Sequence, residues 1–183
     1  MNREEAQQVF AQSEEIVGAA EVANAVQRMA SEIGQAIGED FPLVLSVMGS
    51  AAVFTGMLLP HLAFPLEFDY IHLTRYRNTM QGGPGMEWRV APRESVKDRV
   101  VLVLDDLLHE GETMAAIRDR LLQMGASRFL CAVLCEKNLP QAKPLQPDFR
   151  GFEVPNRYVF GCGLDARGYW RNLPTIRALN ADA

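Results

Sequence analysis

The sequence predicts an α/β fold, a mainly parallel twisted sheet flanked by helices, with a small C-terminal cap. Residues 100–104 are five consecutive Val and Leu residues, a pattern typical of a strand buried on both faces, as in a parallel sheet. Residues 113–124 carry apolar side chains spaced for one helix face, and Gly125 follows as a helix stop. A second apolar run covers 129–135. Because strand and helix patterns alternate, we expect right-handed βαβ units with helices on both faces of the sheet.

The remaining elements follow from the same periodicities. The N-terminal segment reads as helical to about Gly38, since residues 22, 26, 29, 33 and 37 share a helix face, and Gly18 is a candidate break. Further along the chain we expect a strand over 41–47, an exit loop over 48–50, a helix over about 52–62, a strand over 67–73 and a short strand over 88–90.

Two segments are predicted from composition. Residues 74–86 contain Arg75, Tyr76 and a glycine cluster, which predicts a flexible loop. Residues 136–183 are rich in Pro and aromatic residues, which indicates a smaller cap over the C-terminal edge of the sheet. We therefore expect one domain over 1–183, with its core at about 40–135, a cap from about 136 and an N-terminal helical segment over 1–38.

Composition excludes several classes of protein. A chain of 183 residues with 48% hydrophobic content fits one domain with a sizeable core. Its net charge of −5 argues against a general binder of nucleic acids or of membrane surfaces. No apolar run reaches the roughly 18 residues that span a bilayer, and the N-terminus is charged rather than signal-like. Three cysteines without metal-site spacing suit the reducing cytoplasm, and we interpret all three as structural.

Two adjacent acids follow the strand over 100–104. Asp105 and Asp106 stand at its expected end, a turn containing Gly111 comes next, and Thr113 opens the following helix. The N-terminus of a helix behind the edge of a parallel sheet binds anions, and carboxylates there can hold hydroxyl groups or a metal. A lone Asp pair would be interpreted as a helix cap or a surface turn, but the flanking strand and loop favour a site. The segment predicts a sugar-phosphate ligand.

This segment resembles the phosphoribosyl pyrophosphate motif of type I phosphoribosyltransferases: an apolar strand, two acids, two apolar residues and a short phosphate loop ending in Gly-x-Thr. A second stretch, over 148–165 and 169–174, resembles the purine-binding and C-terminal part of hypoxanthine-guanine phosphoribosyltransferases. The order of Lys137, Tyr158, Val159, Asp165 and Arg171 fits the spacing in that family. The resemblance covers roughly residues 40–180.

The resemblance implies purine salvage, in which hypoxanthine or guanine reacts with phosphoribosyl pyrophosphate to give the nucleotide and pyrophosphate, with Mg²⁺ as cofactor. Asp105 and Asp106 would hold the ribose hydroxyls directly or through Mg²⁺, with Asp105 and Asp165 as the acids nearest the metal. The 5′-phosphate would be bound by the loop residues Glu110, Gly111, Glu112 and Thr113. Pyrophosphate would be bound by Met48, Gly49 and Arg171, the last through bidentate geometry.

The same resemblance implies a purine site made by Lys137, Tyr158, Val159 and Asp165. The ammonium of Lys137 would donate to the purine O6 and so select oxopurines over adenine. Tyr158 would stack on the base, and Val159 would offer its backbone carbonyl. Without the resemblance, Lys137 would be a solvated surface group and Tyr158 ordinary packing.

The phosphate loop departs from the family pattern. His109 stands where the family usually has an Asp proposed as the general base at purine N7, and Glu110 stands where a small hydroxylated residue is usual. A histidine can accept a proton near neutral pH, so His109 either replaces that base or the role is lost. Glu110 and Glu112 would repel phosphate if they pointed inward, and backbone N–H groups would bind it if they pointed outward. Met48 replaces the Lys often found before Gly49.

We expect a cytoplasmic homodimer or homotetramer that binds phosphoribosyl pyrophosphate and an oxopurine, and neither nucleic acid nor membrane. Two alternatives stay open. One is a regulatory protein that binds nucleotide or phosphoribosyl pyrophosphate, with catalysis weakened through His109 and Glu110. The other is an enzyme for another base, such as xanthine.

Overall fold

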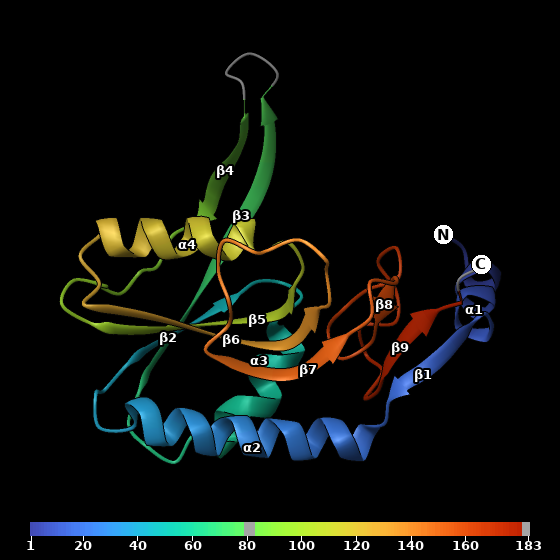
Figure 1. The fold of residues 1–183 in the computed structure, drawn as a ribbon, viewed down its shortest axis with the longest axis horizontal. Coiled ribbons are helices and arrows are strands. Elements are labelled where there is room, and N and C mark those ends of the chain that lie inside the picture. The colour runs from blue at the N-terminus through green and yellow to red at the C-terminus, as the bar shows by residue number, and fades with distance from the viewer. Residues whose placement is uncertain (79–82, 181–183) are drawn as a thin grey trace.

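The structure is a computed structural model that describes residues 1–78 and 83–180, with backbone only for 75–78 and 83–86. A six-stranded sheet forms its centre, and a smaller three-stranded sheet lies at one end (Figure 1). The strand order of the large sheet is β4-β3-β2-β5-β6-β7. Its strands are β2 (Leu43–Val47), β3 (Glu67–Asn78), β4 (Gly83–Val90), β5 (Val100–Leu108), β6 (Arg128–Lys137) and β7 (Phe149–Val154).

All neighbouring pairs in this sheet are parallel except β3 and β4, which form an antiparallel hairpin that projects from the body (Figure 1). The predicted α/β class, with a mainly parallel sheet, is therefore confirmed. Parallel register places the C-terminal ends of β2, β5 and β6 at one edge of the sheet. The segments with predicted site residues leave the sheet at that edge.

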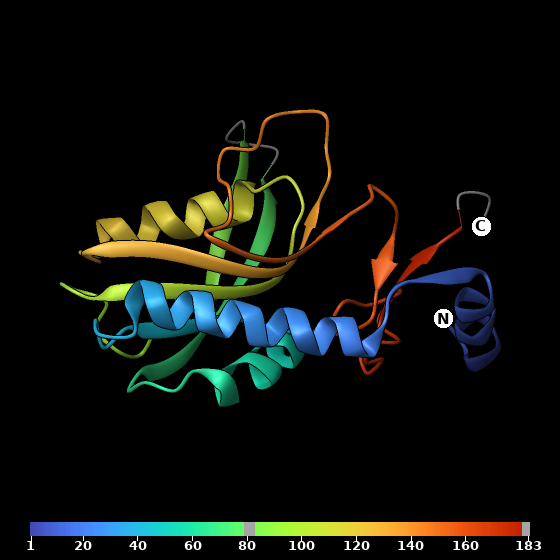
Figure 2. The ribbon, with the colours of Figure 1, turned by 60° about the horizontal axis from the view of Figure 1, so that its bottom comes forward.

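Helices cover both faces of the sheet, as Figure 2 shows. One face packs against α2 (Ala19–Ile37) and α3 (Ala52–Leu58), which a short 3₁₀ turn, Leu59–His61, extends. The other face packs against α4 (Glu112–Gln123). Leu102 and Leu104 of β5 contribute to the first core, and Val101 and Val103 to the second. This alternation explains why residues 100–104 are apolar without interruption.

The N-terminal segment differs from the expected single helical stretch. It contains α1 (Arg3–Ala11), strand β1 (Ser13–Val17) and then α2. The break at Gly18 lies at the start of α2, where the Glu21 carboxylate accepts a hydrogen bond from the Gly18 N–H at 2.8 Å. Strand β1 pairs with β9 (Ile176–Leu179), which also pairs with β8 (Val159–Phe160). The pairing partner lies about 160 residues away, so local periodicity could not predict β1.

Three further boundaries correct the sequence-based expectations. Strand β5 runs to Leu108, so Asp105 and Asp106 lie inside the strand and not behind it. Residues 136–183 are not only a cap, because β7 extends the large sheet. Residues 74–78 and 83–86 belong to the β3–β4 hairpin and not to a loop. The flexible-loop prediction otherwise falls on 79–82 and on the side chains of Arg75 and Tyr76, which lie outside the described residues.

Among the described residues, no helix is both long enough and apolar enough to cross a membrane.

Candidate active site

Asp105 and Asp106 form a closely spaced carboxylate pair near the end of β5. Asp106 is 4% exposed, and its Oδ1 accepts a hydrogen bond from the Ser50 hydroxyl at 3.0 Å. Its Oδ2 is buried and has no hydrogen-bond partner. Burial raises the pKa of Asp106, and burial together with the charge of Asp106 raises the pKa of Asp105 well above its ordinary range. The pair is therefore unfavourable when both acids are ionised without a ligand, and a cation or hydroxyl group would relieve it.

The loop after β5 enters α4 through Gly111. Gly111 is buried, has φ +81° and precedes the first helical residue, Glu112. The N-cap residue Gly111 has no side chain to cap this helix end, and the N-terminus of a helix favours an anion. His109, Glu110 and Glu112 are exposed, and Thr113 is half-buried. The exposure of both glutamates agrees with the arrangement in which backbone N–H groups, and not the acidic side chains, face a phosphate.

The exit of β2 lies beside the acid pair. The peptide bond between Met48 and Gly49 is cis, and a Cβ built on Gly49 would meet no atom within 4 Å. Open space therefore lies next to this backbone. Ser50 follows, and its carbonyl oxygen lies only 2.2 Å from the place that a Cβ on Gly163 would occupy. Gly163, at φ +103°, thus permits the C-terminal segment to pack directly on the turn that holds Asp106.

A cavity of about 450 Å³ lies next to this edge of the sheet. It brings together five of the predicted site residues: His109, Lys137, Tyr158, Val159 and Asp165. They come from four separate segments: the loop after β5, the end of β6, the start of β8 and the turn that follows it. Its volume falls in the range of small-ligand sites.

Lys137 is not a solvated surface group. It ends β6, is 6% exposed and donates from Nζ to the carbonyl oxygens of Pro155, at 3.3 Å, and Arg157. Burial lowers the pKa of Lys137. Two carbonyls hold the ammonium in one orientation at the wall of the cavity. A donor-only group in such a position favours a ligand that presents an acceptor.

Tyr158 and Val159 differ in exposure. Tyr158 is 50% exposed and lies at the cavity wall, so a flat ligand can reach it, whereas Val159 is 6% exposed within β8. Asp165 accepts an N–H hydrogen bond from Gly168 at 2.5 Å and pairs with Arg171 at 2.7 Å. Arg171 also donates to the Gly163 carbonyl at 2.6 Å. Burial raises the pKa of Asp106, and hydrogen bonds together with the positive charge of Arg171 act in the opposite direction.

The acid pair fits a divalent cation in part. Within residues 1–78 and 83–180, no three His, Cys, Asp or Glu side chains gather closely enough to hold a metal ion by themselves. The unpartnered Asp106 Oδ2 and the neighbouring Asp105 carboxylate are nevertheless hard oxygen donors. Mg²⁺ commonly binds through one or two carboxylates plus substrate phosphates and water. The residues present suit a metal that arrives with a phosphorylated substrate.

The three cysteines are buried and free. Burial raises the pKa of Cys131 to about 12 and that of Cys162 to about 11, and it raises the pKa of Cys135 further. These thiols therefore stay protonated at neutral pH, which agrees with a structural role.

Sequence reasoning missed several residues around the site. Ser50 was expected only as part of an exit loop, yet its hydroxyl binds Asp106. The remaining cavity residues are Leu107, Asn156, Arg157 and Leu164. Asn156 and Arg157 precede Tyr158 directly, so they lie within the stretch 148–165 that resembles the family. Nothing in their spacing showed that the carbonyl of Arg157 would receive Lys137.

The family model of the phosphoribosyl transferase domain matches residues 12–167. A hypoxanthine-guanine-xanthine phosphoribosyltransferase of Tritrichomonas foetus is 31% identical over 155 residues, covering 84% of each chain. A hypoxanthine-guanine phosphoribosyltransferase of Bacillus subtilis is 27% identical over 164 residues, covering 90% of this chain and 91% of its own.

Solved structures agree with these relatives. A hypoxanthine-guanine-xanthine phosphoribosyltransferase superposes with a TM-score of 0.82 at 27% identity, over 91% of this chain and 96% of that one. A hypoxanthine phosphoribosyltransferase of Staphylococcus aureus, at 19% identity, shares the fold with a TM-score of 0.87, over 100% of this chain and 97% of that one. The predicted resemblance is confirmed, and the chain belongs to the phosphoribosyltransferase family.

Proposed function

We propose that this protein is a purine salvage enzyme that transfers the phosphoribosyl group of phosphoribosyl pyrophosphate to hypoxanthine or guanine. The observation that carries the proposal is the cavity of about 450 Å³ that joins Lys137, Tyr158 and His109. It lies beside the buried acid pair and near the start of α4. In this proposal the base occupies the cavity, the ribose lies at the acid pair and the phosphate lies at the start of α4, all near the edge of the sheet where β5 and β6 end.

The phosphate and ribose ends of the substrate have separate partners. The 5′-phosphate binds the backbone N–H groups of residues 109–113, where the helix dipole of α4 favours negative charge. Asp105 and Asp106 accept hydrogen bonds from the ribose hydroxyls. Asp105, with Asp165, would hold Mg²⁺, which would supply positive charge that stabilises the leaving pyrophosphate. Asp165 lies on the purine side and orients Arg171.

The base binds in the cavity. Lys137 donates to the purine O6, which adenine lacks, and Tyr158 stacks on the ring. The Val159 carbonyl faces the N2 edge. Because the Lys137 ammonium already has two carbonyl partners, the base meets a donor whose direction is set before binding.

The transfer breaks the bond between C1′ and the pyrophosphate oxygen and forms the bond between C1′ and purine N9. The transition state resembles an oxocarbenium ion, so catalysis consists of positioning and of stabilising the leaving pyrophosphate. Arg171 and the backbone at Met48 and Gly49 face that leaving group. The purine loses a ring proton as N9 attacks, and His109 at the cavity wall accepts it.

A product assay tests the proposal. The protein is incubated with phosphoribosyl pyrophosphate, Mg²⁺ and hypoxanthine, guanine, xanthine or adenine in turn, and nucleotide formation is followed by chromatography. We expect turnover with hypoxanthine or guanine and none with adenine. Binding of phosphoribosyl pyrophosphate without turnover of any base would instead support the regulatory alternative.

We further propose that the protein works in the cytoplasm as a homodimer or homotetramer. Light scattering after size-exclusion chromatography measures the assembly, and a monomer at micromolar concentration would contradict it.

A further inference from the structure

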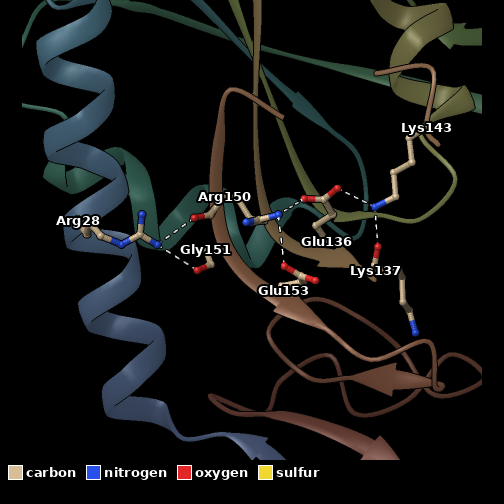
Figure 3. A network of polar contacts seen from close by, with 7 residues as sticks. All are labelled: Arg28, Glu136, Lys137, Lys143, Arg150, Gly151 and Glu153. Atoms are coloured by element: carbon tan, nitrogen blue, oxygen red, sulfur yellow. Dashed lines mark hydrogen bonds and ion pairs between the residues drawn. The ribbon is translucent and has the colours of Figure 1, made fainter. Parts of the chain in front are cut away.

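An ion cluster lies at the end of β6, next to Lys137. Glu136, the residue before Lys137 in β6, is 4% exposed and accepts a hydrogen bond from Lys143 at 2.7 Å and another from Arg150 at 2.5 Å. The Lys143 side chain is 6% exposed, whereas that of Arg150 is 44% exposed. Figure 3 shows Glu136 between these two cations, with Glu153 paired to Arg150 as well. None of the roles proposed above uses Glu136, Lys143 or Arg150.

Lys143 differs from Arg150 in what else it contacts. Its Nζ donates to the backbone carbonyl of Lys137 at 2.5 Å, as Figure 3 shows. Its Cβ lies 3.4 Å from the place that a Cβ on Gly111 would occupy, and the Leu145 carbonyl lies 3.3 Å from the same place. The segment that carries Lys143 therefore packs against the phosphate loop, while its ammonium holds the strand end beside the purine cavity. Arg150 reaches Glu136 and Glu153 only on the far side of the cluster.

Charge balance alone does not account for Lys143. Burial raises the pKa of Glu136, but the hydrogen bonds and charges of Lys143 and Arg150 outweigh burial, so this pKa lies below its ordinary value. Arg150 is shared between Glu136 and Glu153, whereas the bond of Lys143 to the Lys137 carbonyl neutralises no carboxylate. Buried ion pairs add little net stability compared with apolar residues of similar volume, and their best-attested use is to fix one arrangement. The arrangement that Lys143 fixes joins the phosphate loop to the strand end beside the purine cavity.

We propose that Lys143 is a positioning residue that ties the phosphate loop to the strand end carrying Lys137, and so sets the spacing between the phosphate and purine ends of a bound nucleotide. This inference rests on the proposed function. A nucleotide contacts both ends, so its affinity depends on their spacing. A free base or a free sugar phosphate contacts one end only. Loss of Lys143 should therefore weaken binding of the whole nucleotide more than binding of its parts.

The test compares Lys143→Met with Arg150→Met, its matched control, because each variant removes one cation from Glu136 and only the first removes the contact with Lys137. Affinities for inosine monophosphate, hypoxanthine and ribose 5-phosphate are measured by competition at a temperature where all variants are folded. We expect Lys143→Met to bind the nucleotide about tenfold more weakly or worse, with changes below about threefold for the two fragments. Arg150→Met should bind all three like the parent.

A double variant, Glu136→Gln with Lys143→Met, removes the buried carboxylate together with its buried cation and so keeps the test valid if Lys143→Met folds poorly. We expect it to regain thermal stability without regaining affinity for the nucleotide. Recovered nucleotide affinity in this double variant, or equal losses for all three ligands in Lys143→Met, would overturn the positioning role. A parent protein that binds inosine monophosphate but turns over no base would contradict the proposed function alone. A parent that does not bind the nucleotide would contradict both.

Discussion

Replacing Asp106 by Asn should stabilise the protein and weaken its ligand binding at the same time. The carboxylate is 4% exposed, its Oδ2 has no partner, and Asp105 lies beside it. An amide keeps the acceptor for the Ser50 hydroxyl and adds a donor toward Asp105. Leaving a buried polar atom unsatisfied costs about 1–3 kcal/mol, so we expect a gain of that order. In a chain of this size, each kcal/mol corresponds to about 2–4 °C in Tm.

The gain should depend on pH in a defined direction. Burial raises the pKa of Asp106 in the folded protein above its ordinary value of 3.8, so the folded state binds the proton more tightly than the unfolded state. The ionised carboxylate then lowers stability progressively as pH rises from 3.8 through the folded pKa. The advantage of Asn is therefore full at pH values above the folded pKa and disappears toward pH 4.

Binding should change in the opposite direction. A hydrogen bond to a charged group contributes about 1.5–3 kcal/mol, so losing one ribose contact should weaken phosphoribosyl pyrophosphate binding by roughly 10- to 150-fold. Calorimetry measures Tm across pH, and titration with phosphoribosyl pyrophosphate and Mg²⁺ measures affinity. Asp119→Asn, at an exposed site on α4, is the control for a surface carboxylate. A variant that is less stable and binds normally would refute the reasoning, because Asp106 would then be a structural group.

Substitutions at three other positions test separate parts of the site. Lys137→Met should weaken oxopurine binding by about 2–5 kcal/mol, because it removes a buried charged donor, and an unchanged KM for hypoxanthine would contradict its role. His109→Ala should reduce kcat about 10²–10⁴-fold, whereas His109→Asp should retain activity and extend it to lower pH; parental turnover of the Ala variant at every pH would show that residue 109 carries no proton. Gly163→Ala should destabilise the fold by at least about 1–3 kcal/mol in urea unfolding, since φ is +103° and the new Cβ would lie 2.2 Å from the Ser50 carbonyl oxygen; an unchanged midpoint would mean that the turn can move.

Local patterns in the sequence were sufficient for the fold class and for most of the site segments. The uninterrupted Val and Leu run of β5 requires burial on two faces, and that requirement alone indicates a parallel sheet with helices on both sides. The family motifs located the acid pair, the predicted phosphate loop and the predicted purine residues along the chain. Parallel strands end at one edge, so it also followed that these segments meet there. The cavity joins His109 with Lys137 and Tyr158 as this reasoning expected.

Only the tertiary structure determined which groups form hydrogen bonds and ion pairs with one another. Strand β1 exists because its residues pair with β9, as Ser13 does with Leu179, and Asp106 is held by Ser50 from a different βα unit. The ion pair of Glu136 with Lys143 closes a loop whose course no periodicity predicts. Helix and strand periods report burial of neighbouring residues, whereas hydrogen bonds and ion pairs depend on where distant backbone segments come to lie. Sequence therefore indicated which residues gather at the site, and packing determined which atoms of those residues touch.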